Sequence, residues 1–245
     1  METANFNDSL TEIENCFACD AVNGVYSDSI QNIPLLDTGK EFIFPAIGAG
    51  IGQNTDDYCI VCPPVHKRSF AHLPPERLAR FACLFESIKS TTHKKYGNNI
   101  LIYETGKGYD EPFNSKAFSH AHTQIFTNID PEQILWYINE ILKKEENLKP
   151  MQKIDYAEEL PNYKYQRYGG LWVGDEFYIT TENFKPRFLR EHLCDLADKK
   201  PELADYRKHK SVKNVQKTIL NVGPLIPKLK KDFNQRLIAA GLDTY

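Results

Sequence analysis

Four short apolar runs, each rich in aromatic and β-branched residues, most constrain what this chain can fold into. They lie at residues 41–47, 58–62, 99–104 and 123–127. Runs of this length and composition are typical of strands in a sheet. Helices do not separate them in the regular alternation that produces a parallel sheet. The pattern therefore predicts an α+β fold in which helices pack on an antiparallel β-sheet.

Two amphipathic helices are predicted between and after these strands. In residues 75–95, apolar side chains recur at helical spacing from Leu78 to Ile88, and Pro75 suits a first helical turn. A second helix is predicted to start at Asp130, because a capping residue there is followed by proline.

The second half of the chain is less regular than the first. Two short runs, at residues 171–173 and 177–180, flank a Gly-Asp pair and are predicted to form a β-hairpin. Helical stretches are expected around residues 185–198 and 211–221. No internal repeat or Gly/Ser-rich linker divides the 245 residues.

The composition is that of a soluble globular protein, with 41% hydrophobic and 26% charged residues. No apolar run reaches the length of a membrane helix, and the N-terminus lacks the pattern of a secretory signal. The protein is therefore expected in the cytoplasm, without a membrane partner. In that compartment its six cysteines are expected to be mostly reduced thiols.

The charges are unevenly distributed along the chain. Residues 1–65 carry ten acidic side chains and one basic side chain, Lys40, whereas residues 206–231 carry eight basic and no acidic ones. The basic stretch could attract a phosphate-rich ligand, but solvated helix faces are the favoured interpretation. With a pI of about 6.2 and no recognisable motif, no specific nucleic-acid partner is expected.

The most informative motif is His120-Ala121-His122-Thr123-Gln124. If this segment is extended, alternation places His120, His122 and Gln124 on one face. Imidazole can act as a nucleophile or base near neutral pH, and an amide can donate to a phosphoryl oxygen. The two histidines could instead bind one metal ion, or form part of a polar strand face. The apolar neighbours of the motif favour a functional site.

Two Cys-x-x-Cys pairs have different predicted roles. Cys16 and Cys19 are typical of one half of a zinc site that needs two further N or S ligands. Cys59 and Cys62 lie in a predicted strand, where positions i and i+3 face opposite sides, so we expect them to pack as buried thiols. His66 is a freer candidate ligand. A thioredoxin-like redox role for the first pair is disfavoured because no strand precedes it.

The order of motifs over residues 12–130 resembles the histidine-triad (HIT) superfamily. That order is Cys-x-x-Cys, strand, Gly-rich loop, strand, Pro-Pro-Val-His, amphipathic helix, strand ending in Tyr-Glu-Thr-Gly, and His-x-His-x-Gln. The last motif is similar to that of the galactose-1-phosphate uridylyltransferase and diadenosine-polyphosphate phosphorylase branches. The resemblance implies a HIT-like catalytic core in residues 1–130. Residues 131–245 would then be a mixed C-terminal extension packed on that core as part of one structural unit.

The resemblance also implies roles for individual residues. His122 matches the nucleophile, which would attack the α-phosphorus of a nucleotide and form a covalent nucleotidyl-histidine. Gln124 matches the amide that would hold a non-bridging oxygen of that intermediate. The implied cofactor is a structural zinc ion, and its ligands would be Cys16, Cys19, His66 and His120.

Three further residues are expected to contact substrate phosphates: Lys107, Lys116 and Ser119. The family usually has a serine three residues before the first histidine of the motif, and this chain has Ala117 there. The C-terminal extension could close the pocket or bind the group that accepts the nucleotide.

The predicted function is that of a nucleotidyl transferase or hydrolase acting on a nucleotide phosphoanhydride or phosphoester. The resemblance implies adenine nucleotides or dinucleoside polyphosphates as small-molecule substrates, and a glutamine in place of a third histidine favours transfer over hydrolysis. One alternative is a nucleotide-binding regulatory protein with a zinc-stabilised HIT scaffold and little turnover, which the alanine at position 117 supports. Another is a zinc-stabilised interaction module. Because relatives often dimerise, a homodimer is a further expectation.

Overall fold

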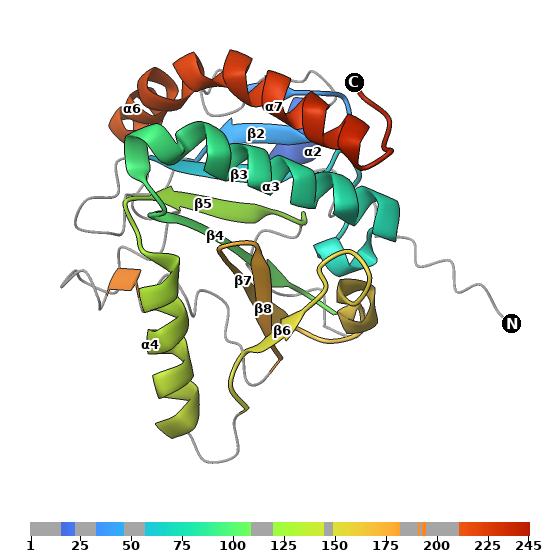
Figure 1. Cartoon of the computed structure of the whole chain (residues 1–245), viewed down its shortest axis with the longest axis vertical. Helices are drawn as coiled ribbons and strands as arrows, with labels where there is room; N and C mark the ends of the chain where they lie inside the picture. The colour runs from blue at the N-terminus through green and yellow to red at the C-terminus, as the bar shows by residue number, and fades with distance from the viewer. Residues whose placement is uncertain are drawn as a thin grey trace, which may run out of the picture.

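A computed structural model describes residues 16–22, 33–46, 57–108, 120–144, 149–181, 191, 193–194 and 211–245. One eight-stranded sheet has the order β1-β2-β3-β5-β4-β7-β8-β6, and every neighbouring pair is antiparallel (Figure 1). The strands are β1 (Leu36–Asp37), β2 (Phe42–Pro45), β3 (Tyr58–Cys62), β4 (Ile100–Gly106), β5 (Thr123–Thr127), β6 (Gln152–Ile154), β7 (Tyr168–Val173) and β8 (Glu176–Thr180). The predicted α+β class with an antiparallel sheet is confirmed.

Helices cover this sheet, and α7 runs alongside α3 (Figure 1). The described α-helices are α2 (Phe17–Val22), α3 (Pro75–Tyr96), α4 (Pro131–Lys144), α6 (Val212–Val222) and α7 (Ile226–Ala239). Short 3-10 turns are η2 (Phe70–His72), η3 (Leu160–Tyr163) and η5 (Gly223–Leu225). Among the described helices, none is long and apolar enough to cross a membrane.

The helix predicted over residues 75–95 is α3, with one residue added at its end. Its buried side chains include Leu78, Phe81 and Phe85, whose spacing places them on one face of the helix. The helix ends at Gly97, which has a φ of 62°. A glycine adopts this left-handed conformation without the steric cost that a Cβ atom would add. The predicted bounds therefore agree with those of the helix to within one residue.

Two hydrophobic cores lie on opposite faces of the sheet. The first, here called the α3 core, includes Phe81 and Ile125 and is covered by α3 and α7. The second, the α4 core, includes Phe126 and Ile138 and is covered by α4. Neighbouring residues of β5 thus enter different cores, because successive side chains of a strand point to opposite faces.

Cys59 and Cys62 follow the same alternation along β3. Cys59 is buried in the α3 core, whereas Cys62 is buried in the α4 core. Burial raises the pKa of both thiols, because the low-dielectric interior disfavours the thiolate. The prediction that these two cysteines are separate packing thiols is confirmed.

Residues beyond position 130 complete the sheet. β7 pairs with β4, and β8 and β6 extend the sheet from there. The predicted hairpin is formed by β7 and β8, and the predicted helix over residues 211–221 corresponds to α6. The helix expected at residues 185–198 lies almost wholly outside the described residues. The division of the chain at residue 130 stays a prediction.

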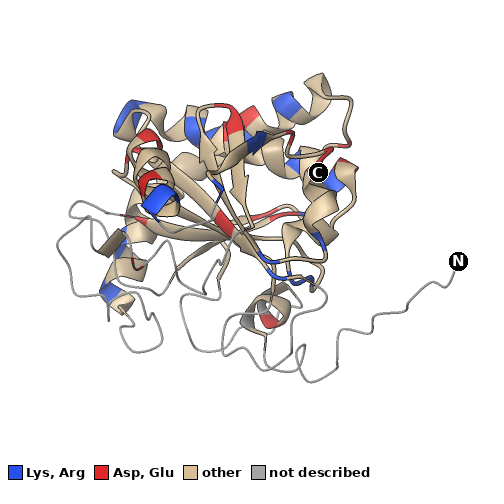
Figure 2. Cartoon of the chain, turned by 90° about the horizontal axis from the view of Figure 1, so that it is seen from below, with Lys and Arg blue, Asp and Glu red and all other residues tan. Residues whose placement is uncertain are grey.

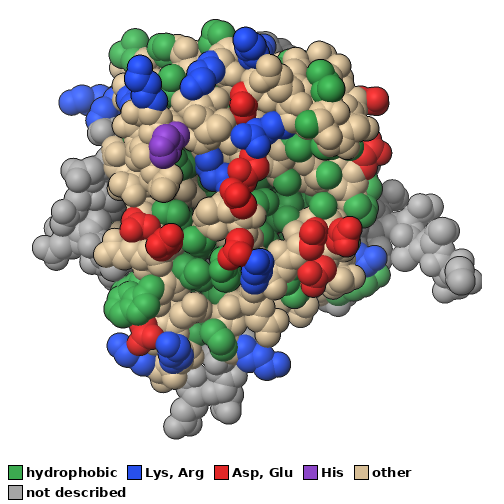
Figure 3. All heavy atoms as spheres, in the orientation of Figure 1, with side chains coloured by type: hydrophobic (Ala, Val, Ile, Leu, Met, Phe, Trp, Pro, Cys, Tyr) green, Lys and Arg blue, Asp and Glu red, His purple; other side chains and the backbone are tan. Residues whose placement is uncertain are grey.

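The C-terminal helix α7 was not predicted, although its signal is present in the sequence. Its buried residues Ile226, Leu229, Phe233 and Leu237 recur at helical spacing, starting within the basic stretch and continuing past its end. Basic side chains of the same stretch occupy the exposed positions between them. Figure 3 shows separate blue groups along the top of the molecule, over α6 and α7. Solvated helix faces thus account for the described part of the basic stretch.

A buried ion pair ties the C-terminal segment to α3. Arg80 donates from Nε to Glu41 Oε1 (2.6 Å) and from Nη2 to Oε2 (3.1 Å), and it also donates to the Asp243 carbonyl. Both charged side chains are at most 1% exposed. Along the ribbon, basic and acidic residues are distributed over several helices and strands (Figure 2). The pair is therefore the point at which β2, α3 and the C-terminus are joined.

Candidate functional site

Four side chains from three distant parts of the chain converge on one point. Cys16 immediately precedes α2, Cys19 lies within it, His66 follows β3, and His120 precedes β5. One ligand atom from each lies within 4.8 Å of the other three. The four residues named as zinc ligands by the resemblance are thus brought together in space, and we call them the Cys/His cluster.

The distances within the Cys/His cluster fit a tetrahedral zinc site. His120 Nδ1 lies 3.4 Å from both Cys16 Sγ and Cys19 Sγ, and His66 Nδ1 lies 3.1 Å from Cys19 Sγ. Sulfur and nitrogen ligands of a tetrahedral zinc ion are separated by about 3.6 Å, given its usual bond lengths. Three of the four residues are almost fully buried, with exposures of 1–6%. A closed set of two thiols and two imidazoles suits a structural zinc ion.

A hydrogen bond beyond the ligand atoms orients His120. Its Nε2 donates to the Pro63 carbonyl oxygen over 2.8 Å, which leaves Nδ1 as the nitrogen that faces the thiols. The next residue is held as well, because Ala121 N donates to the Lys67 carbonyl oxygen over 2.5 Å. The segment that enters β5 is therefore fixed to the residues that follow β3.

The two thiols of the cluster differ in acidity. The Cys19 thiol donates a hydrogen bond to the sulfur of Cys16, and this lowers the pKa of Cys16 below its usual value. The pKa of Cys19 is raised, because its proton is used in the hydrogen bond to Cys16 and because burial disfavours a second charge. The thiolate is the form of cysteine that binds metal, so the lowered pKa of Cys16 suits it to a ligand role.

His122 does not belong to the Cys/His cluster. Its Nδ1 donates to the carbonyl oxygen of His120 over 3.0 Å. A neutral imidazole that donates from Nδ1 carries its lone pair on Nε2, the nitrogen that can act as a nucleophile. The hydrogen-bonded ladder of β5 starts only at Thr123, and the two histidine rings bond different groups. His120 bonds the Pro63 carbonyl oxygen, whereas His122 bonds the carbonyl oxygen of His120. Among the described residues, the cluster that could hold a metal ion includes His120 and does not include His122.

Gln124 lies on the face of β5 that looks into the α4 core. It is 7% exposed, and its Oε1 accepts a hydrogen bond of 2.9 Å from the hydroxyl of Tyr58. His122 precedes it by two positions and lies just before the start of β5. Sequence reasoning missed Tyr58, because its contact with Gln124 depends on the pairing of β3 with β5.

Lys107 is half-buried and directly follows the last residue of β4. The neighbouring strand pairs Tyr168 with Gly106, so Arg167 occupies the register position opposite Lys107. Alternation along β4 places Lys107 on the same face as Tyr103, the face that carries Gln124. Arg167 was not predicted, since nothing local in the sequence pairs it with β4. Lys116 and Ser119 lie outside the described residues.

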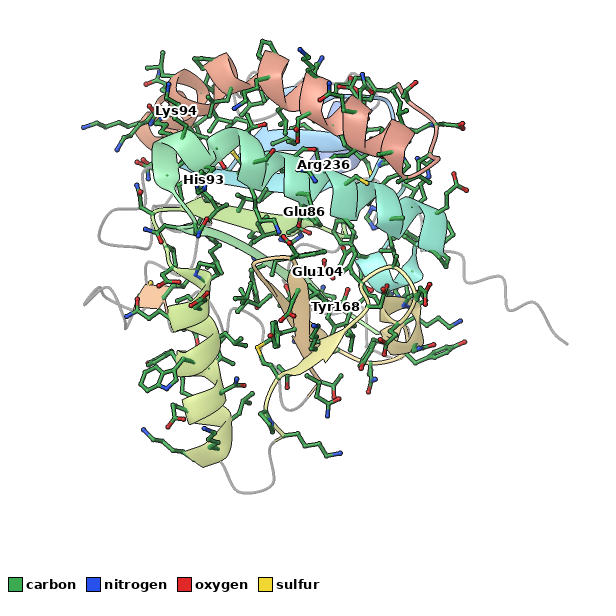
Figure 4. The ribbon with its side chains drawn as sticks, in the orientation of Figure 1. Glu86, His93, Lys94, Glu104, Tyr168 and Arg236 are labelled. Carbon is green, nitrogen blue, oxygen red and sulfur yellow. The ribbon has the colours of Figure 1, made fainter. Side chains whose placement is uncertain are left out.

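A buried carboxyl group lies on the other face of the sheet, next to the strand of His122. Glu104 accepts hydrogen bonds from Tyr168 (2.5 Å), Tyr156 (2.9 Å) and Thr123 (3.5 Å). Figure 4 shows Glu104 and Tyr168 together beneath α3. Burial raises the pKa of Glu104 to about 7, although the three hydroxyl donors partly offset this rise. The sequence had given Glu104 no role beyond its place in the strand.

No protein-family model and no curated protein matches the sequence. Two solved structures from Arabidopsis thaliana are similar in fold, each with 9% sequence identity and a TM-score of 0.35. One is an ADP-glucose phosphorylase with bound ADP-glucose, and the match covers 60% of this chain and 73% of that chain. The other is a GalT-like protein, with coverage of 68% and 84%.

Proposed function

We propose that this protein transfers nucleotidyl groups through a covalent intermediate on His122. In the first step His122 Nε2 attacks the α-phosphorus of a nucleotide. A nitrogen–phosphorus bond forms, the phosphorus–oxygen bond to the leaving group breaks, and the leaving group departs with the electron pair. In the second step an acceptor oxygen attacks the same phosphorus and releases Nε2. Phosphate, water or another metabolite can serve as this acceptor.

The observation that carries the proposal is the tether between the Cys/His cluster and His122. The cluster and Pro63 hold the His120 ring, and the carbonyl oxygen of His120 accepts a hydrogen bond from His122 Nδ1. This carbonyl selects the tautomer whose lone pair is on Nε2 and limits the rotation of the ring. A pre-oriented nucleophile reacts faster, because the entropy of orientation is lost during folding rather than in the reaction.

Gln124 supports the same chemistry from the neighbouring position. Its amide nitrogen can donate to a non-bridging oxygen of the phosphoryl group as negative charge builds up there. Lys107 and Arg167 add positive charge on the same side of the sheet, which favours a polyanionic substrate over a neutral one.

A zinc ion fits the Cys/His cluster, where Cys16, Cys19, His66 and His120 would hold it. When bound, it would supply structural rigidity to the segment that carries His122, rather than an activated water, because all four positions are taken by protein ligands. The chemical step is then left to His122 and Gln124.

The function is tested by incubating the protein with ATP or a dinucleoside polyphosphate that is labelled at the α-phosphorus. We expect label on the protein that is released by acid and retained in base, as for a phosphoramidate. His122→Ala should abolish the label, whereas His93→Ala, which removes an exposed imidazole on α3, should retain it. Absence of label from the wild type, with nucleotide bound equally by wild type and His122→Ala, would favour the regulatory nucleotide-binding protein instead.

The zinc proposal has an independent test. Metal analysis should find about one zinc ion per chain, and Cys16→Ser should lose it. Cys59→Ser is the matched control, because Cys59 is equally buried but lies in the α3 core. Full zinc content in a Cys16→Ser, Cys19→Ser double variant would refute the ligand assignment.

A further inference from the structure

We propose that Tyr58 is a positioning residue that holds the Gln124 amide in place for the substrate. The inference rests on the proposed nucleotidyl transfer and adds a residue to it. A glutamine amide has one accepting end and one donating end, and rotation by half a turn exchanges them. Only the orientation that directs the nitrogen toward the substrate can stabilise a phosphoryl oxygen. In the opposite orientation the amide oxygen of Gln124 would face the phosphoryl oxygen of the substrate, and both are acceptors.

The contact between the two side chains follows from the pairing of β3 with β5. Tyr58 lies opposite Phe126, and Ile60 lies opposite Gln124. Tyr58 and Gln124 are therefore diagonal neighbours on one face of the sheet, a separation that a tyrosine side chain can bridge. Its hydroxyl donates to Gln124 Oε1 over 2.9 Å. With Oε1 on the Tyr58 hydroxyl, the amide nitrogen lies on the side of the carboxamide away from that hydroxyl.

The Tyr58 ring is held rigidly in its place. It stacks on the Phe126 ring with a centroid distance of 4.4 Å and an interplanar angle of 7°. Its backbone is bound on both sides, since Tyr58 N donates to Thr218 Oγ1 (3.3 Å) and Ala46 N donates to Tyr58 O (2.8 Å). The side chain is only 7% exposed. The hydroxyl on this ring is therefore held at one position, from which it bonds the amide oxygen.

Burial makes the choice of orientation matter more than it would at the surface. Gln124 is also 7% exposed, so water has little access to compensate an amide in the wrong orientation. Inside a protein, a donor or acceptor that lacks its partner is costly. Tyr58 thus prepares the donor before substrate arrives, and its effect should appear in the chemical step rather than in binding.

A double-mutant cycle tests this role. The single-turnover rate of label transfer to His122 is measured in the wild type, Tyr58→Phe, Gln124→Ala and the double variant. Tyr58→Phe retains the stacked ring and should slow transfer roughly three- to tenfold, the loss expected for one hydrogen bond, with the dissociation constant for nucleotide unchanged. In the Gln124→Ala background the same change should have no further effect. Tyr178→Phe, which removes a hydroxyl that donates to Glu176, is the control and should label at the wild-type rate.

The outcomes separate the two proposals. If the wild type becomes labelled and Tyr58→Phe slows transfer equally with and without Gln124, Tyr58 has only a structural role and the inference is overturned. An unchanged rate in Tyr58→Phe overturns it as well. If the wild type itself is never labelled, the proposed function fails, and the role of Tyr58 fails with it. Equal thermal unfolding midpoints of wild type and Tyr58→Phe would show that a slower rate does not come from misfolding.

Discussion

Glu104 offers a direct measure of how much a buried charge destabilises this fold. The carboxyl group is fully buried, and its pKa is raised from 4.5 to about 7, chiefly by loss of solvation. A pKa above its unfolded value means that the folded state binds the proton more tightly than the unfolded state does. Glu104 therefore stabilises the fold below about pH 4.5, and this contribution is lost as the pH rises to about 7.

The size of this effect follows from the pKa. A rise from 4.5 to about 7, at about 1.36 kcal/mol for each pKa unit, corresponds to about 3 kcal/mol. Glu104→Gln cannot ionise, yet it retains the shape of the side chain and its ability to bond with Tyr156 and Tyr168. The free energy of unfolding of the variant, relative to wild type, should therefore rise by about 3 kcal/mol between pH 4.5 and pH 8.

The assay is urea unfolding of wild type and Glu104→Gln at a series of pH values, followed by circular dichroism. The difference between the two proteins isolates Glu104, because every other titrating group, including the Cys/His cluster, is common to both. Glu76→Gln removes an exposed carboxylate from α3 and serves as the control for the loss of a surface carboxylate. A constant difference between wild type and Glu104→Gln from pH 4.5 to pH 8 would refute the reasoning.

Three further changes probe the packing, the buried ion pair and the metal. Gly106→Ala would place a Cβ atom 1.9 Å from the Tyr168 ring and should lower the free energy of unfolding by about 1–3 kcal/mol in the same urea assay. Gly223→Ala is its control and should have little effect, because its Cβ atom would meet no atom within 4 Å. Arg80→Met leaves the Glu41 carboxylate buried without its partner and should cost about 3–5 kcal/mol; an equal loss in an Arg80→Met, Glu41→Gln double variant would contradict this explanation. A strong chelator should lower the thermal unfolding midpoint of the wild type, and an unchanged midpoint would argue against a structural metal.

Local pattern was sufficient for the elements whose side chains repeat regularly. The periodicity of α3 and the alternation of Cys59 and Cys62 across β3 both depend on the geometry of a single element. The same kind of signal marked α7, where Phe233 lies in a correctly spaced apolar set, but the charge of the surrounding stretch obscured it. The resemblance of the motifs named the four residues of the Cys/His cluster, which the fold brings within reach of one another.

The sequence by itself determined the fold class, the strands β2 to β5, the hairpin of β7 and β8, and the helices α3, α4 and α6. The resemblance of its motifs also named the four residues of the Cys/His cluster. Tertiary structure alone decided which residues are neighbours. Tyr58 meets Gln124, and Glu104 meets Tyr168, only because β5 lies between β3 and β4 and because β7 joins the far side of β4. Such pairs are joined across strands that are far apart in the chain, so no local periodicity records them. The orientation of the Gln124 amide and the raised pKa of Glu104 both arise from these long-range pairs.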